Sequence, residues 1–326
     1  MTITLGHGSG GRLSHELLER HFLPRLHNPV LAELGDAAVV GDLALTTDGY
    51  VVSPRFFPGG DIGKLAVCGT LNDLAMMGAE PVALTAAFVL EEGLALEELD
   101  RIVASMAATA AEERVPVVAG DTKVVPRGAC DGVFITTAGV GRLQPGFRPA
   151  PAKIAAGDAL LASGTIADHG MAVMACREGL RLTGELASDV AALVDLVRAL
   201  RLAGIEVHAM RDPTRGGVAQ SAIELARAAS VRVVIEEPRL PIRPPVLAAC
   251  ELLGLDPLYV ANEGKLLAFV PEPQGQKALG VLRGHALGRR AAIIGRAEAG
   301  EPGVVLATAL GAQRSVRMPA GELLPR

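Results

Sequence analysis

Four aspartates stand at points of the chain where a carboxylate could help to hold a metal ion. Asp36 and Asp48 lie at the two ends of a segment with strand-like alternation, and Asp121 follows a short apolar run. Asp73 lies within Ile62–Met77, a helix-length run that is apolar on nearly every side. Converging carboxylates repel one another unless hard cations lie between them. The four are therefore candidate Mg²⁺ ligands, although each alone could be a turn or cap residue.

The helix predicted over Ile62–Met77 organises the first half of the chain. A helix without a polar face is normally buried. Lys64 and Asp73 lie nine residues apart, so they point to opposite sides of this helix. A lone buried carboxylate is costly unless a cation, a metal or several donors meet it. Asp73 is thus either a metal ligand or half of a structural ion pair, and Gly78 is the expected end of the helix.

Two glycine-rich turns precede predicted helices. The first covers residues 6–11 (Gly-His-Gly-Ser-Gly-Gly), and apolar residues at helical spacing follow it up to Phe22. Backbone N–H groups in such a turn can bind phosphate, but the segment lacks a preceding long strand and the Lys-Ser/Thr ending of a Walker A loop. It is either a flexible arm or one that closes over a nucleotide. In the second turn, over residues 211–217, Arg215 either contacts a phosphate or carbamoyl group or belongs to a helix cap.

Composition limits the class of protein. The 326 residues suffice for two domains, and 50% are hydrophobic with only 3% aromatic, so aliphatic packing must carry the stability. The net charge of -5 is not typical of a nucleic-acid-binding protein. Apolar runs are too short for a membrane span and the N-terminus lacks a signal segment, which predicts a cytoplasmic protein without a membrane partner. The four scattered cysteines predict neither a zinc site nor disulfides.

Strand and helix patterns alternate along the first half of the chain, which predicts an α/β domain. Strands are expected near residues 37–54, 81–90, 116–123 and 132–140, with a helix over 97–112. Proline density rises near 142–151, and the domain boundary is placed there, giving domains 1–150 and 151–317 and a mobile tail 318–326. In the second domain helices are expected over 169–177, 188–203, 218–229, 244–253 and 276–284. Strands are expected near 158–164, 231–236, 266–270, 292–295 and 304–307.

Several motifs in this order resemble the HypE family, the carbamoyl dehydratases of [NiFe]-hydrogenase maturation. This family belongs to the PurM-like superfamily, which includes aminoimidazole ribonucleotide synthetase. The resemblance covers nearly the whole chain. It rests on His7–Gly11, Thr47–Val51, Phe56–Gly60, Ile62–Ala66, Asn72-Asp73, Gly120–Val124, Asp168–Gly170, Thr214–Gly217 and Asn262–Lys265.

The resemblance implies a fold, a reaction and partners. The expected fold has an N-terminal α/β domain whose sheet joins that of a second subunit, a C-terminal α+β sandwich, and ATP with Mg²⁺ in the cleft between the domains. The expected reaction is ATP-dependent dehydration of a carbamoyl group on a C-terminal cysteine thiol to a thiocyanate, which supplies cyanide to the hydrogenase iron. The expected partners are a second copy, the carbamoyltransferase HypF and the iron-carrying HypC–HypD complex.

The resemblance also assigns roles to residues. Dehydration needs a base for the nitrogen protons; Lys123 and Glu263 are the catalytic candidates, although either could instead form a salt bridge. The metal candidates remain Asp36, Asp48, Asp73 and Asp121. The nucleotide candidates are His7, Gly8, Ser9, Gly10, Gly11, Lys64, Asn72, Thr122 and Arg215.

The chain departs from the family pattern at two places. Gly35 stands where a second acid often precedes the Asp36 position, which affects one metal contact. The chain ends in Leu-Pro-Arg326 where the family ends in Pro-Arg-Ile-Cys, so it is expected to bind ATP without accepting the carbamoyl group until Ile-Cys is appended. Two alternatives stay open: a small-molecule kinase or synthetase of the superfamily, and a nucleotide-binding assembly partner without catalysis.

Overall fold

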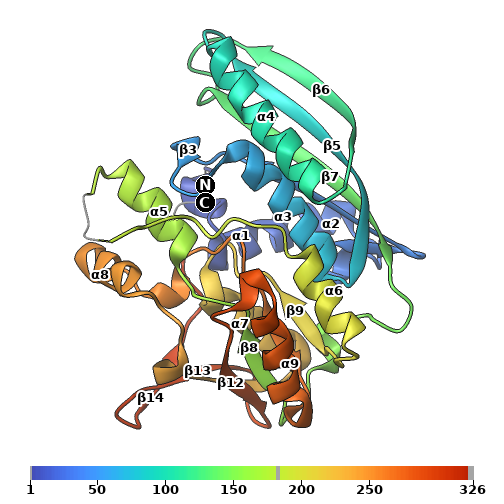
Figure 1. Ribbon diagram of the computed structural model, residues 1–326, viewed down its shortest axis with the longest axis vertical. Coiled ribbons are helices and arrows are strands. Elements are labelled where there is room, and N and C mark those ends of the chain that lie inside the picture. The colour runs from blue at the N-terminus through green and yellow to red at the C-terminus, as the bar shows by residue number, and fades with distance from the viewer. Residues whose placement is uncertain (1, 181–183, 322–326) are drawn as a thin grey trace.

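The computed structural model describes residues 2–180 and 184–321, which form two main sheets and a small hairpin (Figure 1). The first sheet has the order β1-β2-β7-β5-β6, with β1 Ala38–Val40, β2 Leu43–Tyr50, β5 Ala79–Glu91, β6 Val117–Val125 and β7 Val133–Leu143. The second has the order β14-β13-β10-β12-β8-β11-β9, with β8 Ala159–Ala162, β9 Ala209–Arg211, β10 Arg232–Glu236, β11 Leu267–Val270, β12 Ala292–Glu298, β13 Gly303–Ala307 and β14 Gln313–Val316. The hairpin pairs β3 Phe56–Phe57 with β4 Gly60–Asp61.

The helices follow the expected order with few exceptions. Near the N-terminus, α1 Gly11–Leu17, the π-helical turn Leu18–Phe22 and α2 Leu23–Leu26 form one continuous helical segment. The remaining helices are α3 Ile62–Met76, α4 Leu96–Glu112, α5 Asp168–Arg177, α6 Val194–Leu202, α7 Gly217–Ala229, α8 Pro244–Leu253 and α9 Glu272–Gly284. None of the helices in the described ranges is long and apolar enough to cross a membrane.

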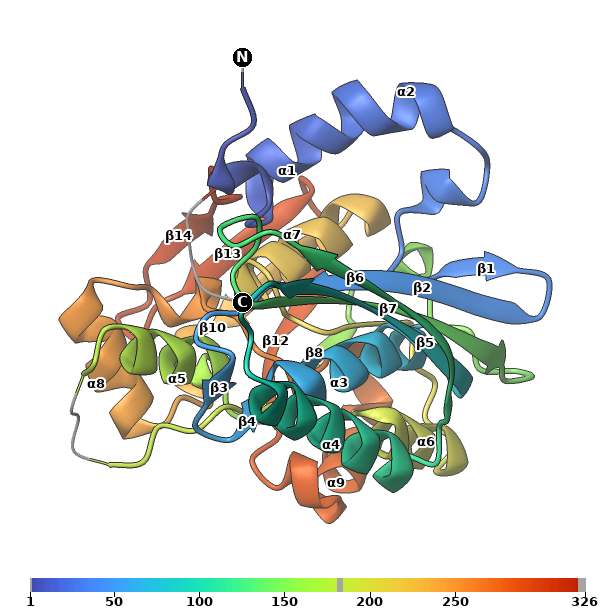
Figure 2. The ribbon, with the colours of Figure 1, turned by 90° about the horizontal axis from the view of Figure 1, so that it is seen from above.

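The first sheet carries helices α3 and α4 on one face (Figure 2). Neighbouring strands run antiparallel except β5 and β6, which are parallel and joined through α4. Burial alternates along the strands, so that Ile135 and Thr137 of β7 face the helices while Thr136 between them is exposed. The edge strand β6 is exposed along nearly its whole length. This sheet therefore has a packed face, a partly open face and an unpaired edge.

Helix α3 lies between the two halves of the molecule. Its first turn is capped by Asp61, whose side chain accepts hydrogen bonds from the N–H groups of Gly63 and Lys64 at 2.8 and 3.0 Å. The chain leaves the helix at Gly78, which has a φ of +73°. Because α3 contacts β2, β5 and β7 on one side and α6 and β9 on the other, it has no solvent-facing stripe. The predicted all-round burial of this helix is thus confirmed.

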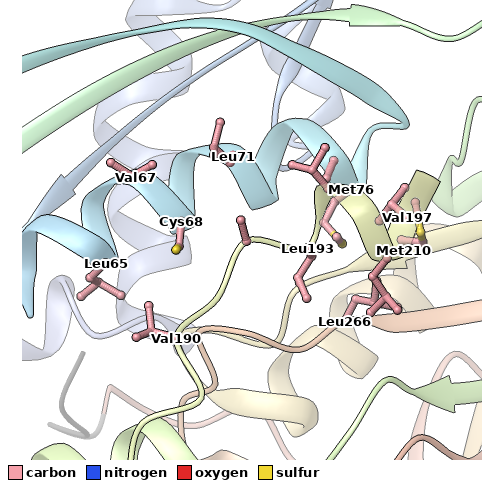
Figure 3. Packing of buried hydrophobic residues seen from close by; sticks show 14 of the residues in the cluster. Leu65, Val67, Cys68, Leu71, Met76, Val190, Leu193, Val197, Met210 and Leu266 are labelled. Atoms are coloured by element: carbon pink, nitrogen blue, oxygen red, sulfur yellow. The ribbon is translucent and has the colours of Figure 1, made fainter. Parts of the chain in front are cut away.

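One hydrophobic cluster crosses α3 and joins the two sheets (Figure 3). On the helix side it contains Leu65 and Cys68, which face the extended segment that holds Val190 and Leu193. Each fully buried aliphatic side chain of this kind stabilises the fold by about 1.5–3 kcal/mol relative to exposure. The shared cluster fixes one half of the chain against the other and therefore fixes the site that lies between them.

Four expectations about the elements need correction. The helix expected over 188–203 begins only at Val194, because residues 188–193 are extended and run across α3. The strand expected up to residue 54 ends at Tyr50. Strand β6 continues to Val125, beyond the end expected at residue 123. The short strands β9 and β14 were not expected.

The tail predicted over 318–326 is described only to residue 321. Within that part Met318 packs against the core of the second sheet. The carbonyl oxygens of Pro319 and Ala320 accept hydrogen bonds from the N–H groups of Arg12 and Leu13 at 2.8 and 3.3 Å. These residues therefore hold the first turn of α1, and residues 322–326 lie outside the described range.

Candidate functional site

Three of the four predicted metal ligands lie close together between α3 and β2. The Oγ1 of Thr46 donates to Asp73 Oδ2 at 2.8 Å and also contacts the carbonyl oxygen of Asp36 at 3.2 Å. Asp48 stands two residues beyond Thr46 on the same strand, so it lies on the same face of β2. Its Oδ1 accepts the N–H of Gly49 at 2.8 Å. The sequence therefore placed these three carboxylates correctly at one location.

A fourth carboxylate, Asp212, completes this acidic cluster from the second half of the chain. It follows strand β9 and is 6% exposed. Burial raises the pKa of Asp73 well above its ordinary value, and the charges of Asp212, Asp36 and Asp48 raise it further. No role was predicted for Asp212, although it lies in the polar turn 211–217. Asp212 is placed by β9, and this strand of three residues is too short to show a periodic pattern in the sequence.

Arg211 provides positive charge at the edge of the acidic cluster. Its Nε lies 2.9 Å from Asp36 Oδ1, and its guanidinium also pairs with Glu224 of α7. Burial raises the pKa of Asp36 even though Arg211 acts in the opposite direction. The carboxylates of the cluster are thus only partly neutralised by protein groups.

The donor set of the acidic cluster suits a hard cation that brings further ligands with it. In the described part of the chain, no three acidic, histidine or cysteine side chains are arranged to hold an ion by themselves. Mg²⁺ in proteins is commonly held by one or two carboxylates together with phosphate oxygens of the substrate and water. The cluster fits that arrangement and does not form a complete cage.

Asp121 does not join the acidic cluster within one chain. It pairs in register with Ala87 of β5, and strands β5 and β7 separate it from β2. Its carboxylate lies at the exposed edge and binds Lys123 Nζ at 2.8 Å, which lowers its pKa. Thr122 and Lys123 are exposed on the same strand. The expectation that four predicted aspartates converge is therefore wrong for a single protomer, because the sheet order separates β6 from β2.

The glycine arm, residues 6–11, lies against the first turn of α7. Gly10 and Gly11 have φ values of +81° and +74°, and a Cβ on Gly10 would lie 3.1 Å from the Cβ of Arg215. The N–H of Gly11 donates to Gln220 Oε1 at 2.8 Å. The arm thus brings its backbone beside Arg215.

The other predicted residues of the arm make local contacts. The ring Nδ1 of His7 lies 2.9 Å from the hydroxyl of Thr4, and the hydroxyl of Ser9 donates to the carbonyl oxygen of Gly6 at 3.0 Å. Gly8 is exposed. These contacts shape the arm from within.

Asn72 joins the two halves of the molecule. Its Nδ2 donates to the carbonyl oxygens of Ala191 and Glu263 at 3.1 and 3.4 Å, and its Oδ1 accepts the N–H of Leu193 at 2.8 Å. The residue is 1% exposed. These three hydrogen bonds of its amide are therefore structural, whereas the sequence predicted a nucleotide contact.

Glu263 lies at the same junction and is 1% exposed. Its main chain is fixed on both sides, because its N–H donates to Asp189 Oδ1 at 3.2 Å and its carbonyl oxygen accepts from Asn72. The neighbouring Gly264 approaches the backbone so closely that a Cβ there would lie 1.8 Å from the carbonyl oxygen of Asp189. Lys123, by contrast, lies on the exposed β6 strand, so one chain does not bring the two catalytic candidates together.

Lys64 and Glu263 lie on the side of α3 that faces away from Asp73. Burial raises the pKa of the Cys68 thiol to about 12, while the charge of Lys64 lowers it and that of Glu263 raises it again. Both charges therefore lie within electrostatic range of the same thiol. The opposite placement of Lys64 and Asp73 on the helix agrees with their spacing.

Comparison with known proteins identifies the family. Residues 34–143 match the AIR synthase related protein, N-terminal domain, and residues 155–307 match the AIR synthase related protein, C-terminal domain. The carbamoyl dehydratase HypE of Rhodobacter capsulatus is 49% identical over 331 residues, covering 99% of this chain and 97% of the relative. The chain belongs to the HypE family. HypE of Escherichia coli (strain K12) is 46% identical over 334 residues, covering 99% and 98% of the two chains.

Solved structures agree with this assignment. The crystal structure of a HypE–HypF complex has a TM-score of 0.89 and 45% identity, covering 93% of this chain and 99% of the other. HypE in complex with ATP has a TM-score of 0.85 and 46% identity, covering 99% of both chains. The expected PurM-like two-domain fold of a HypE enzyme is thereby confirmed. The ThiL protein complexed with AMPPCP and TMP, with a TM-score of 0.71 and 20% identity, shares the fold.

Proposed function

We propose that this chain is an ATP-dependent carbamoyl dehydratase that converts a carbamoyl group on a C-terminal cysteine thiol into a thiocyanate. The thiocyanate then supplies the cyanide ligands of the [NiFe]-hydrogenase iron. One observation carries the proposal: the acidic cluster and the glycine arm flank the same turn, residues 211–217. The chain also matches, along 99% of its length, a HypE whose structure was solved with ATP.

The reaction needs two bond exchanges. First, the carbamoyl oxygen attacks the terminal phosphorus of ATP; the phosphoryl group moves to that oxygen, ADP leaves and one nitrogen proton is released. The carbon–oxygen bond then breaks, phosphate leaves with its electrons, and loss of the second nitrogen proton completes the C≡N bond. The protein must therefore neutralise phosphate charge and accept protons from nitrogen.

The acidic cluster would hold Mg²⁺ with the nucleotide phosphates. The carboxylates of Asp36, Asp48, Asp73 and Asp212 are the candidate ligands, because burial and mutual repulsion favour a cation among them. When bound, Mg²⁺ would neutralise the charge that develops on the transferred phosphoryl group. The glycine arm would supply backbone N–H groups and Arg215 would supply a cation to the remaining phosphate oxygens.

Glu263 is the proposed proton acceptor. Its main chain is held by Asp189 and Asn72, so its carboxylate is placed with little freedom at the junction of the two halves. Lys123 pairs with Asp121 at the exposed edge of β6, so within one protomer Glu263 is the better placed of the two candidates. The carbamoyl group must enter the junction to reach it.

The proposed assembly is a homodimer formed through the first sheet. Strand β6 offers an unpaired edge on which Val118 and Val124 are 62% and 68% exposed. A groove of 760 Å³, lined mainly by apolar residues of α4 and β6, runs beside this edge. The HypE–HypF complex supports HypF as a partner. By family resemblance, HypF is proposed to supply the carbamoyl group. The HypC–HypD complex is proposed to receive the cyanide on the strength of family resemblance.

Mass analysis of the tail tests the proposed function. The chain extended by Ile-Cys and carbamoylated by HypF is incubated with MgATP, and the expected product is lighter by one water, with one phosphate released per turnover. Asp73→Asn should suppress both signals. Phosphate release without the loss of water would contradict the proposal and favour a kinase or a simple ATPase.

A further inference from the structure

Arg211 is a largely buried cation beside the acidic cluster, where a metal ion is proposed to bind. Its side chain is 15% exposed, and that of its partner Asp36 is 13% exposed. Asp212 lies next in the chain and is also buried, so the guanidinium lies within electrostatic range of three carboxylates, those of Asp36, Glu224 and Asp212. A buried carboxylate cluster without a counter-charge is strongly unfavourable.

We propose that Arg211 is the resident counter-cation of the acidic cluster: it neutralises Asp36 while no divalent ion is bound, and it releases Asp36 and keeps only its pairing with Glu224 when such an ion binds. This inference rests on the proposed function only in that the acidic cluster takes a divalent cation. Arg211 is a positioning residue, since it acts on the ion through Asp36 and does not bind it.

The second partner of Arg211 makes the exchange possible. Its guanidinium already pairs with Glu224, so release of Asp36 does not leave a buried charge alone. Glu224 in turn accepts from Gln220 Nε2 at 2.8 Å, and the Oε1 of Gln220 accepts the N–H of Gly11. A continuous chain of hydrogen bonds therefore connects the glycine arm to the acidic cluster through Arg211.

A positively charged side chain of the protein would stabilise the acidic cluster while no metal ion is bound. Among the residues that the structure describes, the acidic cluster has no complete set of ligands for an ion, so it is expected to bind free Mg²⁺ weakly and to need phosphate oxygens. After one nucleotide has left and before the next one binds, the carboxylates of Asp36, Asp73 and Asp212 would face one another without an ion. Arg211 keeps them assembled during that interval.

The test measures thermal unfolding without nucleotide, by circular dichroism, in MgCl₂ and in NaCl of equal ionic strength. The parent melting temperature should respond little to Mg²⁺, because Arg211 already neutralises Asp36. Arg211→Gln should melt at a lower temperature in NaCl and recover several degrees in millimolar Mg²⁺, because ligand binding to the folded state stabilises it by mass action.

Arg243→Gln is the matched control. Arg243 pairs with the buried Asp168, and its side chain is 23% exposed, but this pair lies outside the acidic cluster. This variant should also melt at a lower temperature, and Mg²⁺ should not restore it. A purely structural role for Arg211 would give the same behaviour as this control, and that result would overturn the proposal.

The double variant Arg211→Gln with Asp36→Asn covers the case in which the single variant does not fold. Removing both charges should return the melting temperature toward that of the parent and abolish the response to Mg²⁺. A double variant that fails to fold, or a parent that Mg²⁺ stabilises as strongly as Arg211→Gln, would also overturn the proposal. Titration of the parent with MgATP separates the two ideas: absence of binding contradicts the proposed function and leaves the melting result unaffected.

Discussion

Replacing Asn72 with alanine should weaken the junction of the two halves while sparing nucleotide binding. The buried N–H of Leu193 would lose its acceptor, which costs about 1–3 kcal/mol for a buried donor. The carbonyl oxygens of Ala191 and Glu263 would each lose a donor, at about 0.5–1.5 kcal/mol per hydrogen bond. Since the effects overlap at one residue, we expect a total loss of about 2–4 kcal/mol.

The assay pairs thermal unfolding with calorimetric titration of MgATP. Asn72→Ala should lower the melting temperature by several degrees and change the MgATP affinity by less than about threefold, a difference well below 1 kcal/mol. Thr109→Val is the control, because Thr109 is buried on α4 and its hydroxyl donates to the carbonyl oxygen of Ser105 in the same helix. Thr109→Val should lower the free energy of unfolding by much less than Asn72→Ala does. An unchanged melting temperature combined with a tenfold or larger loss of MgATP affinity would refute this reasoning and make Asn72 a nucleotide ligand.

Four further predictions follow from the same structure. Asp73→Asn should abolish MgATP binding in calorimetry while Asp121→Asn leaves it nearly unchanged; equal losses would mean that a second protomer completes the site with Asp121. Light scattering should show a dimer for the parent and a monomer for Val118→Lys on β6. A variant that stays dimeric would show that the β6 edge is not the dimer interface. Since the pKa of the Cys68 thiol is about 12, it should stay unmodified by a thiol reagent at pH 8 until the protein unfolds, while the exposed Cys176 reacts; rapid loss of both thiols would contradict its burial. The pKa of Asp73 in the folded state is raised above 3.8, so the folded protein loses stability as pH rises from 3.8 to that folded-state pKa. Over this range the melting temperature of the metal-free parent should fall relative to that of Asp73→Asn. Parallel curves of melting temperature against pH for the two proteins would refute the shift.

The sequence by itself determined the family, the fold and most of the acidic cluster. The run Ile62–Met77 predicted a buried helix because it has no polar face, and α3 indeed packs on both sides. Alternation around Asp36 and Asp48 predicted strands, and β1 and β2 are present. These features depend on local periodicity and on motif order, which a sequence displays directly.

Only the tertiary structure decided which side chains meet. Strand order places β7 and β5 between Asp121 on β6 and Asp48 on β2, and a strand of three residues brings Asp212 to Asp73. Asn72 was expected to contact the nucleotide but is engaged by the extended segment 188–193, which itself had been predicted as helix. Such outcomes depend on contacts between different elements of the fold, and no local pattern encodes them. The partnership of Arg211 with Asp36 and Glu224 has the same origin, because it exists only where β9, α7 and the start of the first sheet come together.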